Sequence, residues 1–197
     1  MIPQTPVDER VVIDSVEWLF QPDWPGPRFI ARCRSEVALL TDATGAAVDD
    51  PGFAEALVRS LAAESAMLDG VWTARGSVDD EGQIEPAFVA IDLLELDGAS
   101  LLDVPFQERR RLLESVLRER PTVRLGPIVK QPLDGWFTGW REAGFTHYLA
   151  RHQNAHYHPG TQADTWLRIP IEAPGATPGF LQHVVGSRRG RGRRIRD

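Results

Sequence analysis

The segment Ile91-Asp-Leu-Leu-Glu-Leu-Asp-Gly98 decides the fold class that we predict for this chain. Apolar residues dominate its first half, and the Asp-Gly pair at its end is typical of a turn. We therefore expect a strand over residues 86–94. Asp103, followed by Val104-Pro105, then opens the clearest helix in the sequence, which should reach about residue 118. The charged run Glu108-Arg-Arg-Arg111 within this helix is interpreted as a solvated face.

Further strands and helices extend outward from this segment in both directions. Two additional helices are expected over residues 50–64 and 133–142, the first because an aspartate and Pro51 form a suitable helix start. Apolar runs bounded by turn residues predict strands over residues 11–20, 29–40, 66–74, 123–129, 145–152 and 166–171. Strands follow one another with helices inserted but without regular alternation. This order predicts an α+β fold with mainly antiparallel sheets and flanking helices.

Length and composition limit the class of protein. A chain of 197 residues with 42% hydrophobic residues is long enough to bury one sizeable core. It has no apolar run long enough for a membrane helix and no secretory signal at its start, so we expect a cytoplasmic location and no membrane partner. Cys33 is the single cysteine, which excludes an internal disulfide and a cysteine-built zinc site. Its expected place is a buried strand position.

The end of the chain differs in charge from the rest. Six arginines and one aspartate give residues 187–197 a net charge of +5, so residues 1–186 carry −11 of the total of −6. The six arginines are Arg188, Arg189, Arg191, Arg193, Arg194 and Arg196. They are candidates for contact with DNA, with an acidic protein partner, or only with solvent. We predict an irregular leader over residues 1–10, one domain over residues 11–173 and a disordered Pro/Gly/Arg-rich tail over residues 174–197.

Several short motifs together resemble one enzyme family. Leu68-Asp-Gly-Val71, the segment that begins at Ile91, Tyr157-His-Pro-Gly160 and Trp166-Leu-Arg168 occur in the order typical of this family. Residues 12–171 are thereby similar to the nucleotidyltransferase (adenylation) domain of ATP-dependent DNA ligases of the bacterial repair type. The resemblance implies an ATP-grasp-like fold, ATP and Mg²⁺ as cofactors, and a lysine that attacks ATP. Ligases of this kind continue into an oligonucleotide-binding (OB) domain, and we expect none here.

The position of the nucleophile departs from the family pattern. The family's Glu-Pro-Lys-Trp-Asp-Gly-x-Arg corresponds to Gln21-Pro-Asp-Trp-Pro-Gly-Pro-Arg28, which places Asp23 where the lysine should be. A lysine amine attacks the α-phosphate after losing a proton. An aspartate brings a negative charge against three phosphates and would form a labile anhydride. The one lysine of the chain, Lys130, lies about a hundred residues further on, so we predict no catalytic residue.

Other positions of the implied nucleotide pocket have also changed. Val71 and Thr146 replace two carboxylates, and Ile91 replaces the aromatic residue that would stack on adenine. The positions of this degenerate pocket are Asp23, Arg28, Val71, Ile91, Thr146, Arg151, Arg168 and Pro170, of which Arg28 keeps the family's residue. Carboxylates are the usual ligands of magnesium, so we expect no metal site. ATP and Mg²⁺ remain expected cofactors only if the family activity persists.

Three arginines and three histidines leave alternatives open. Arg28, Arg151 and Arg168 match positions that face the family's pocket, where they are candidates for binding a phosphate. Alternatively, they form internal salt bridges with Asp23, Asp42 or Asp92. The remaining group, His152, His156 and His158, fits either a metal site or a polar loop.

These observations lead to one main functional hypothesis and two alternatives. The main hypothesis is a ligase-like pseudoenzyme, a catalytically inactive accessory or binding factor in DNA repair that contacts DNA or another repair protein. The first alternative is an active ATP-dependent DNA ligase with unusual residues. The second is a protein that senses a nucleotide or phosphate without a covalent step. The sequence leaves the partner and the oligomeric state open.

Overall fold

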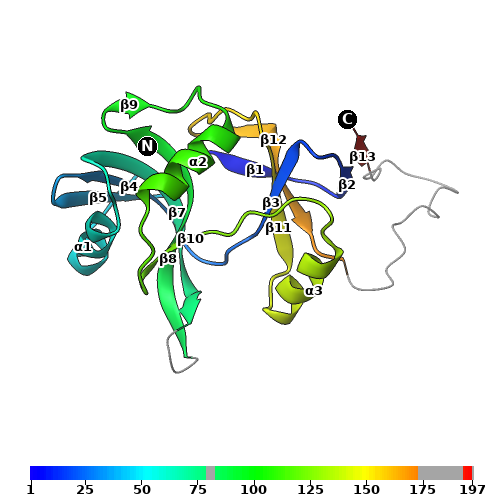
Figure 1. The fold of residues 1–197 in the computed structure, drawn as a ribbon, viewed down its shortest axis with the longest axis horizontal. Helices are drawn as coiled ribbons and strands as arrows, with labels where there is room; N and C mark the ends of the chain where they lie inside the picture. The colour runs from blue at the N-terminus through cyan, green and yellow to red at the C-terminus, as the bar shows by residue number, and fades with distance from the viewer. Residues whose placement is uncertain (79–82, 173–192, 197) are drawn as a thin grey trace, which may run out of the picture. The chain divides into compact units, whose positions relative to one another are not determined.

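The computed structural model describes residues 1–78, 83–172 and 193–196, and it divides into two compact units (Figure 1). Unit 1 comprises Met1–Thr5, Trp24–Pro127 and Gln153–Gln162. Unit 2 comprises Pro6–Asp23, Ile128–His152 and Ala163–Asp197. Residues 173–192 and 197 of the last range lie outside the described residues. Each unit is therefore built from segments that are distant in the sequence.

Unit 1 is organised around a seven-stranded sheet. The order along the sheet is β10-β8-β7-β4-β5-β6, with β9 paired to β8. The strands are β4 (Arg28–Arg34), β5 (Val37–Asp42), β6 (Ala47–Val48), β7 (Ser65–Val78), β8 (Ile84–Leu96), β9 (Ala99–Ser100) and β10 (Val123–Leu125). All pairs are antiparallel except β10 with β8. The mainly antiparallel α+β class predicted from the sequence is confirmed.

The middle parts of strands β7 and β8 are buried on both faces. In β8 every residue from Ala87 to Leu94 is buried, which explains why this strand is an almost continuous apolar run rather than an alternating one. Gly70 of β7 lies so close to β8 that an added Cβ would approach the Phe88 ring within 2.2 Å. The strand predicted over residues 86–94 is confirmed within these longer bounds.

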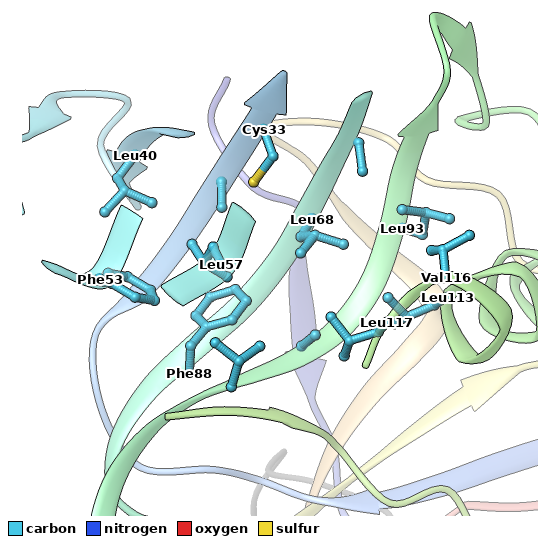
Figure 2. Close-up of a cluster of buried hydrophobic side chains, with 14 of the residues drawn as sticks. Cys33, Leu40, Phe53, Leu57, Leu68, Phe88, Leu93, Leu113, Val116 and Leu117 are labelled. Atoms are coloured by element: carbon cyan, nitrogen blue, oxygen red, sulfur yellow. The ribbon is translucent and has the colours of Figure 1, made fainter. Parts of the chain in front are cut away.

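Helices α1 (Pro51–Arg59) and α2 (Phe106–Val116) pack against one face of this sheet. The side chain of Asp50 caps α1 by accepting a hydrogen bond from the backbone N–H of Phe53 at 3.0 Å. The helix ends at Arg59, five residues before the predicted end. Figure 2 shows the core between helices and sheet, which includes Cys33, Leu40, Phe53, Leu57, Leu68, Phe88, Leu93, Leu113, Val116 and Leu117.

The interpretation of residues 108–111 as a solvated face is wrong for two of the three arginines. Arg109 is fully buried and Arg110 is 7% exposed, whereas Arg111 is exposed. The Arg109 guanidinium makes two parallel hydrogen bonds to the Asp92 carboxylate, at 2.9 Å and 2.8 Å. Its third donor group binds the carbonyl oxygens of Val104 and Ala155. Arg109 is therefore buried because it neutralises the buried Asp92 carboxylate on β8.

Unit 2 contains a second, smaller sheet. Its order is β1-β12-β11-β3, and β11 is antiparallel to both β12 and β3. The bounds are β1 (Thr5–Asp8), β3 (Trp18–Pro22), β11 (His147–His152) and β12 (Gln162–Pro170). Helix α3 (Asp134–Glu142) packs here, with Trp140 in a core that also holds Phe20 and Tyr148. A separate pair joins β2 (Val11–Asp14) in parallel to β13 (Arg193–Arg196).

Some sequence predictions differ from the structure at the ends of the chain. Thr5–Asp8 form β1 within the segment expected to be an irregular leader, and the strand expected over residues 11–20 is split into β2 and β3 by a turn. Of the tail predicted over residues 174–197, the structure describes Arg193–Arg196 as β13, and the rest lies outside the described residues. The boundaries of one domain over residues 11–173 stay a prediction.

Among the residues that the structure describes, no helix combines the length and apolar character needed to span a membrane.

We predict that the buried Arg109–Asp92 pair is essential to the stability of unit 1. Arg109→Ala should lower the free energy of unfolding by about 3–5 kcal/mol, because it leaves the Asp92 charge buried without its partner. The measurement is urea unfolding followed by circular dichroism. Arg111→Ala is the matched control, since Arg111 is 72% exposed beside Glu108, and should cost less than about 0.5 kcal/mol. Equal costs for the two variants would contradict the prediction.

A second prediction concerns alkaline pH. Burial raises the pKa of the Cys33 thiol to about 12, from a usual value of 9.0. The neutral thiol therefore contributes stability that is fully present below about pH 9 and is lost as the pH rises toward 12, because the unfolded state loses the proton first. At pH 10.5 this loss should be about 2 kcal/mol.

The measurement compares urea unfolding of the unchanged protein and of Cys33→Ala at pH 7.5 and pH 10.5. The variant has no thiol to ionise, so its stability should fall less between these two conditions. Parallel losses in both proteins would show that Cys33 does not contribute to the alkaline destabilisation.

Candidate functional site

Asp23, at the position expected for the nucleophile, forms an ion pair in unit 2. It follows β3 directly, and its backbone N–H donates to the carbonyl oxygen of His147 at 3.1 Å. Arg168 on β12 donates from Nε to Oδ2 of Asp23 at 2.7 Å. The same guanidinium donates from Nη1 to Oδ1 of Asp8 at 3.1 Å. One cation thus lies between two carboxylates, and the Asp23 side chain is only 26% exposed.

The two acids set the charge state of this arginine. Partial burial alone would lower the pKa of Arg168, but the hydrogen bonds and charges of Asp23 and Asp8 outweigh it, and the pKa is raised. The guanidinium is therefore always charged, and its charge is balanced within the protein. Asp23 in turn has its carboxylate engaged by a cation. The corner of unit 2 where the resemblance implies a nucleophilic amine holds an internal salt bridge instead.

Arg28 makes a different pair, within unit 1. Its Nε donates to Oδ1 of Asp69 at 2.7 Å, and its Nη2 binds Oδ2 of the same carboxylate. Tyr157 donates its hydroxyl to Asp69 Oδ2 at 2.7 Å and accepts a hydrogen bond from the backbone N–H of Gln4 at 3.0 Å. Asp69 has no exposed side-chain surface. The Arg28 guanidinium thus binds the Asp69 carboxylate within the protein, which is the place a ligand phosphate would otherwise take.

Asp69 and Asp92 lie side by side on adjacent strands. They are register partners in the β7–β8 ladder, and each accepts a two-pronged hydrogen bond from its own arginine, Arg28 or Arg109. Burial lowers the pKa of Arg28, but attraction to Asp69 outweighs it and leaves the pKa raised. The pKa of Tyr157 is raised, first by burial and then by the Asp69 charge, so its hydroxyl remains a donor.

Arg151, the third candidate for phosphate binding, stacks on an aromatic ring. It is 5% exposed, and its guanidinium carbon lies 3.6 Å from the ring centroid of Trp166, its register partner on β12. Arg168 pairs in register with Leu149, two residues before Arg151, so both arginines project from one face of the β11–β12 pair. Arg28 belongs to the other unit. The salt-bridge alternative holds for Arg168 with Asp23, and Arg28 uses Asp69, an acid that was not among those expected.

The remaining altered positions carry no charge. Val71 and Ile91 are buried in unit 1, with exposed fractions of 8% and 2%. Thr146 is exposed in unit 2, where its hydroxyl lies 2.9 Å from Nδ1 of His147. Pro170 is half-buried and is the register partner of His147. None of these four replacements introduces a carboxylate that could hold a divalent cation.

The three histidines are not in one cluster. His152, in unit 2, lies 3.3 Å from a carboxylate oxygen of Glu17 and packs edge-on against Trp18. His156 and His158, in unit 1, have ring centroids 6.5 Å apart. Within residues 1–78, 83–172 and 193–196, no three metal-ligating side chains come together. Of the tail arginines, only Arg193, Arg194 and Arg196 belong to the described chain, as backbone in β13.

Gly26 of the quoted motif is required by the backbone. Its φ is +142°, and a Cβ at this position would lie 2.0 Å from the carbonyl oxygen of Trp72. The adjacent Pro27 accepts a hydrogen bond from the Trp72 N–H at 2.9 Å. The polar network of Asp69, Tyr157 and Arg109 was missed from the sequence. An aspartate such as Asp69 within the apolar run of a strand is the signal that could have revealed it.

Comparison with known proteins identifies the family of this chain. The family model described as "ATP dependent DNA ligase domain" matches residues 55–169, more than half of the chain. The multifunctional non-homologous end joining DNA repair protein LigD of Mycobacterium tuberculosis is 28% identical over 165 residues, which cover 77% of this chain and 21% of LigD. The chain thus spans about a fifth of the length of this relative.

Solved structures share the fold. The ligase domain of M. tuberculosis LigD superposes with a TM-score of 0.68 and 22% identity, covering 85% of this chain and 58% of that domain. A mycobacterial DNA ligase D complexed with ATP gives a TM-score of 0.69 and 21% identity, covering 86% and 60%. The predicted nucleotidyltransferase fold is confirmed. This chain belongs to the ATP-dependent DNA ligase domain family.

Proposed function

We propose that this chain is a ligase-like protein that has lost the adenylation reaction and acts as a binding or accessory factor in DNA repair. The observation that carries the proposal is the Asp23–Arg168 pair. The family's lysine is replaced by an acid, and that acid is held at 2.7 Å by the arginine that takes the place of another family lysine. A lysine-to-arginine exchange across the chain would explain Arg168 but not Asp23.

The chemistry of the site supports a loss of catalysis. Adenylation needs an amine that can give up its proton and attack the α-phosphate. A carboxylate held by Arg168 is a poor nucleophile, and its charge repels the phosphates of ATP. The positions of two family carboxylates hold Val71, which is buried, and Thr146, so neither offers an oxygen anion to magnesium. Lys130, the one lysine, is exposed.

The role in DNA repair rests on relatives. M. tuberculosis LigD is named for non-homologous end joining, and this chain corresponds to about a fifth of it, 21%. We infer that the chain works beside DNA or another repair protein in the cytoplasm, and that the Arg-rich segment from Ser187 to Asp197 supplies the contact. Its net charge of +5 suits a phosphate backbone, whereas the −11 of the preceding residues does not.

Non-covalent phosphate binding is the second candidate function, and one observation favours it. The Arg168 side chain remains 35% exposed, and Arg151 projects from the same face of the sheet. A phosphate could therefore displace Asp23 from Arg168 without unfolding a strand. In this second candidate function, Asp23 weakens phosphate binding at Arg168 but does not prevent it.

The first prediction from the proposal is that the protein forms no covalent adenylate. Incubation with α-labelled ATP and Mg²⁺ or Mn²⁺ should leave no label on the denatured protein, because Asp23 stands at the position of the family's lysine and Val71 and Thr146 stand at the positions of two family carboxylates. The ligase domain of M. tuberculosis LigD serves as the positive control. A stable adduct would overturn the proposal. Its loss in Lys130→Ala, together with loss of nick sealing, would establish the active-ligase alternative instead.

The second prediction is that Asp23→Ala strengthens non-covalent binding of ATP. The variant removes the internal anion from Arg168, and a partly exposed pair of this kind contributes about 1 kcal/mol, so affinity should rise about fivefold. Titration calorimetry in the absence of metal measures the change. Asp8→Ala is the matched control, since Asp8 contacts the same guanidinium but is 76% exposed, and it should change affinity less. Undetectable binding in all three proteins would exclude the phosphate-binding candidate.

A further inference from the structure

One face of the β4–β5 hairpin exposes two arginines and two aliphatic residues. Arg32 pairs in register with Leu39, and Arg34 pairs with Val37, so the four side chains share one face of the sheet. Leu39 is 64% exposed and Val37 is 59% exposed, and both arginines are exposed. We call these four residues the β4–β5 patch. Two large aliphatic side chains this exposed on one strand are unusual beside the buried residues of β7 and β8.

The arginines of the β4–β5 patch differ from the other arginine on the same strand, Arg28, in their contacts. Within the described part of the chain, neither guanidinium forms a hydrogen bond or an ion pair, in contrast to Arg28 on the same strand, which is bound to Asp69. The exposed acid closest in sequence is Glu36, in the turn between β4 and β5. Residues 1–186 carry a net charge of −11, so two adjacent arginines without an acidic partner among the described residues form a local positive exception.

The strand that carries the aliphatic residues also has an open edge. β6 pairs with β5 only at Leu40 and Thr41. Among the described residues, no strand lies along the outer side of Val37–Leu39. In the β4–β5 ladder, Val37 and Leu39 direct their N–H and C=O groups toward β4, so within this stretch Ala38 offers one backbone N–H and one C=O on the outer side.

We propose that the β4–β5 patch is a docking site for an extended acidic segment of a partner protein. The segment adds as a strand beside Val37–Leu39 and forms backbone hydrogen bonds to β5. Its carboxylates face Arg32 and Arg34, and its apolar side chains cover Val37 and Leu39. The inference concerns a different surface from the Asp23–Arg168 site, so it holds whether or not adenylation has been lost.

Charge and composition favour an acidic peptide over other occupants. Single-stranded nucleic acid is bound through aromatic stacking as well as basic residues, and the patch contains no aromatic side chain. A second copy of this chain, joined edge to edge through β5, would bring two identical pairs of arginines together. An acidic, partly apolar segment is the occupant whose charge and shape both match.

The test uses a fluorescein-labelled peptide with the repeat Glu-Ser-Val-Ser, which places glutamate and valine in turn on one face of an extended strand. Fluorescence anisotropy is the readout. The full chain should bind it saturably. The double variant Arg32→Glu and Arg34→Glu should bind at least about tenfold more weakly, because two attractions become repulsions. The matched control, Arg111→Glu and Arg118→Glu, makes the same charge change on exposed arginines of unit 1 and should stay within about twofold. Equal weakening in both double variants would overturn the proposal.

Additional arms separate strand addition from general attraction. A peptide methylated at alternate backbone nitrogens keeps its charge but cannot form the ladder, and it should bind at least about tenfold more weakly. Leu39→Glu should weaken binding, whereas Val16→Glu, at a 72% exposed valine of unit 2, should not. Unimpaired binding of the methylated peptide would overturn strand addition. Tighter binding of oligothymidylate to the patch, or dimerisation through β5 in sedimentation, would overturn the acidic peptide as the partner.

Discussion

Two buried carboxylates at the centre of unit 1 constrain the rest of that unit. Asp69 and Asp92 sit side by side on β7 and β8, where burial makes an unpaired charge very costly. Each is therefore matched by an arginine from another element, Arg28 from β4 and Arg109 from α2. Tyr157 joins the pairs by its hydroxyl and its ring. Strand β4, helix α2 and the 153–162 segment are thus fixed to the two central strands by one charge balance.

In unit 2 an acid is also paired with an arginine, but this pair is partly exposed rather than buried. The Asp23–Arg168 pair is partly exposed, so it contributes little to stability. A family site that handles phosphates needs cations in excess of acids. In this chain the Asp23 carboxylate offsets the positive charge of Arg168. The Arg151 guanidinium stacks on the Trp166 ring. The fold of a nucleotidyltransferase is compatible with this inverted pattern because the strands do not depend on the residue at position 23.

Much of the fold was predictable because the core elements are strongly patterned, and β8 and α2 were found close to their observed bounds. The burial of Arg109 was not, because its partner lies 17 residues away on a strand whose neighbour could not be inferred. Asp23 and Arg168 are 145 positions apart, so hydrophobic periodicity could not relate them. The resemblance to family motifs identified both residues as pocket positions. Arg28 was assigned to a ligand or to other acids, since the sequence alone cannot rank several aspartates by distance.

Gly26 carries a consequence for how similarity should be interpreted in this family. Its positive φ and the nearby Trp72 carbonyl demand a glycine whatever chemistry the loop performs. Selection on the fold alone would therefore retain this residue, and with it a recognisable motif, long after selection on the reaction had ended. Sequence likeness to an enzyme family can outlast the enzyme. The identity of residue 23 bears on whether the family reaction is possible. The glycine at position 26 is required only by the conformation of the backbone.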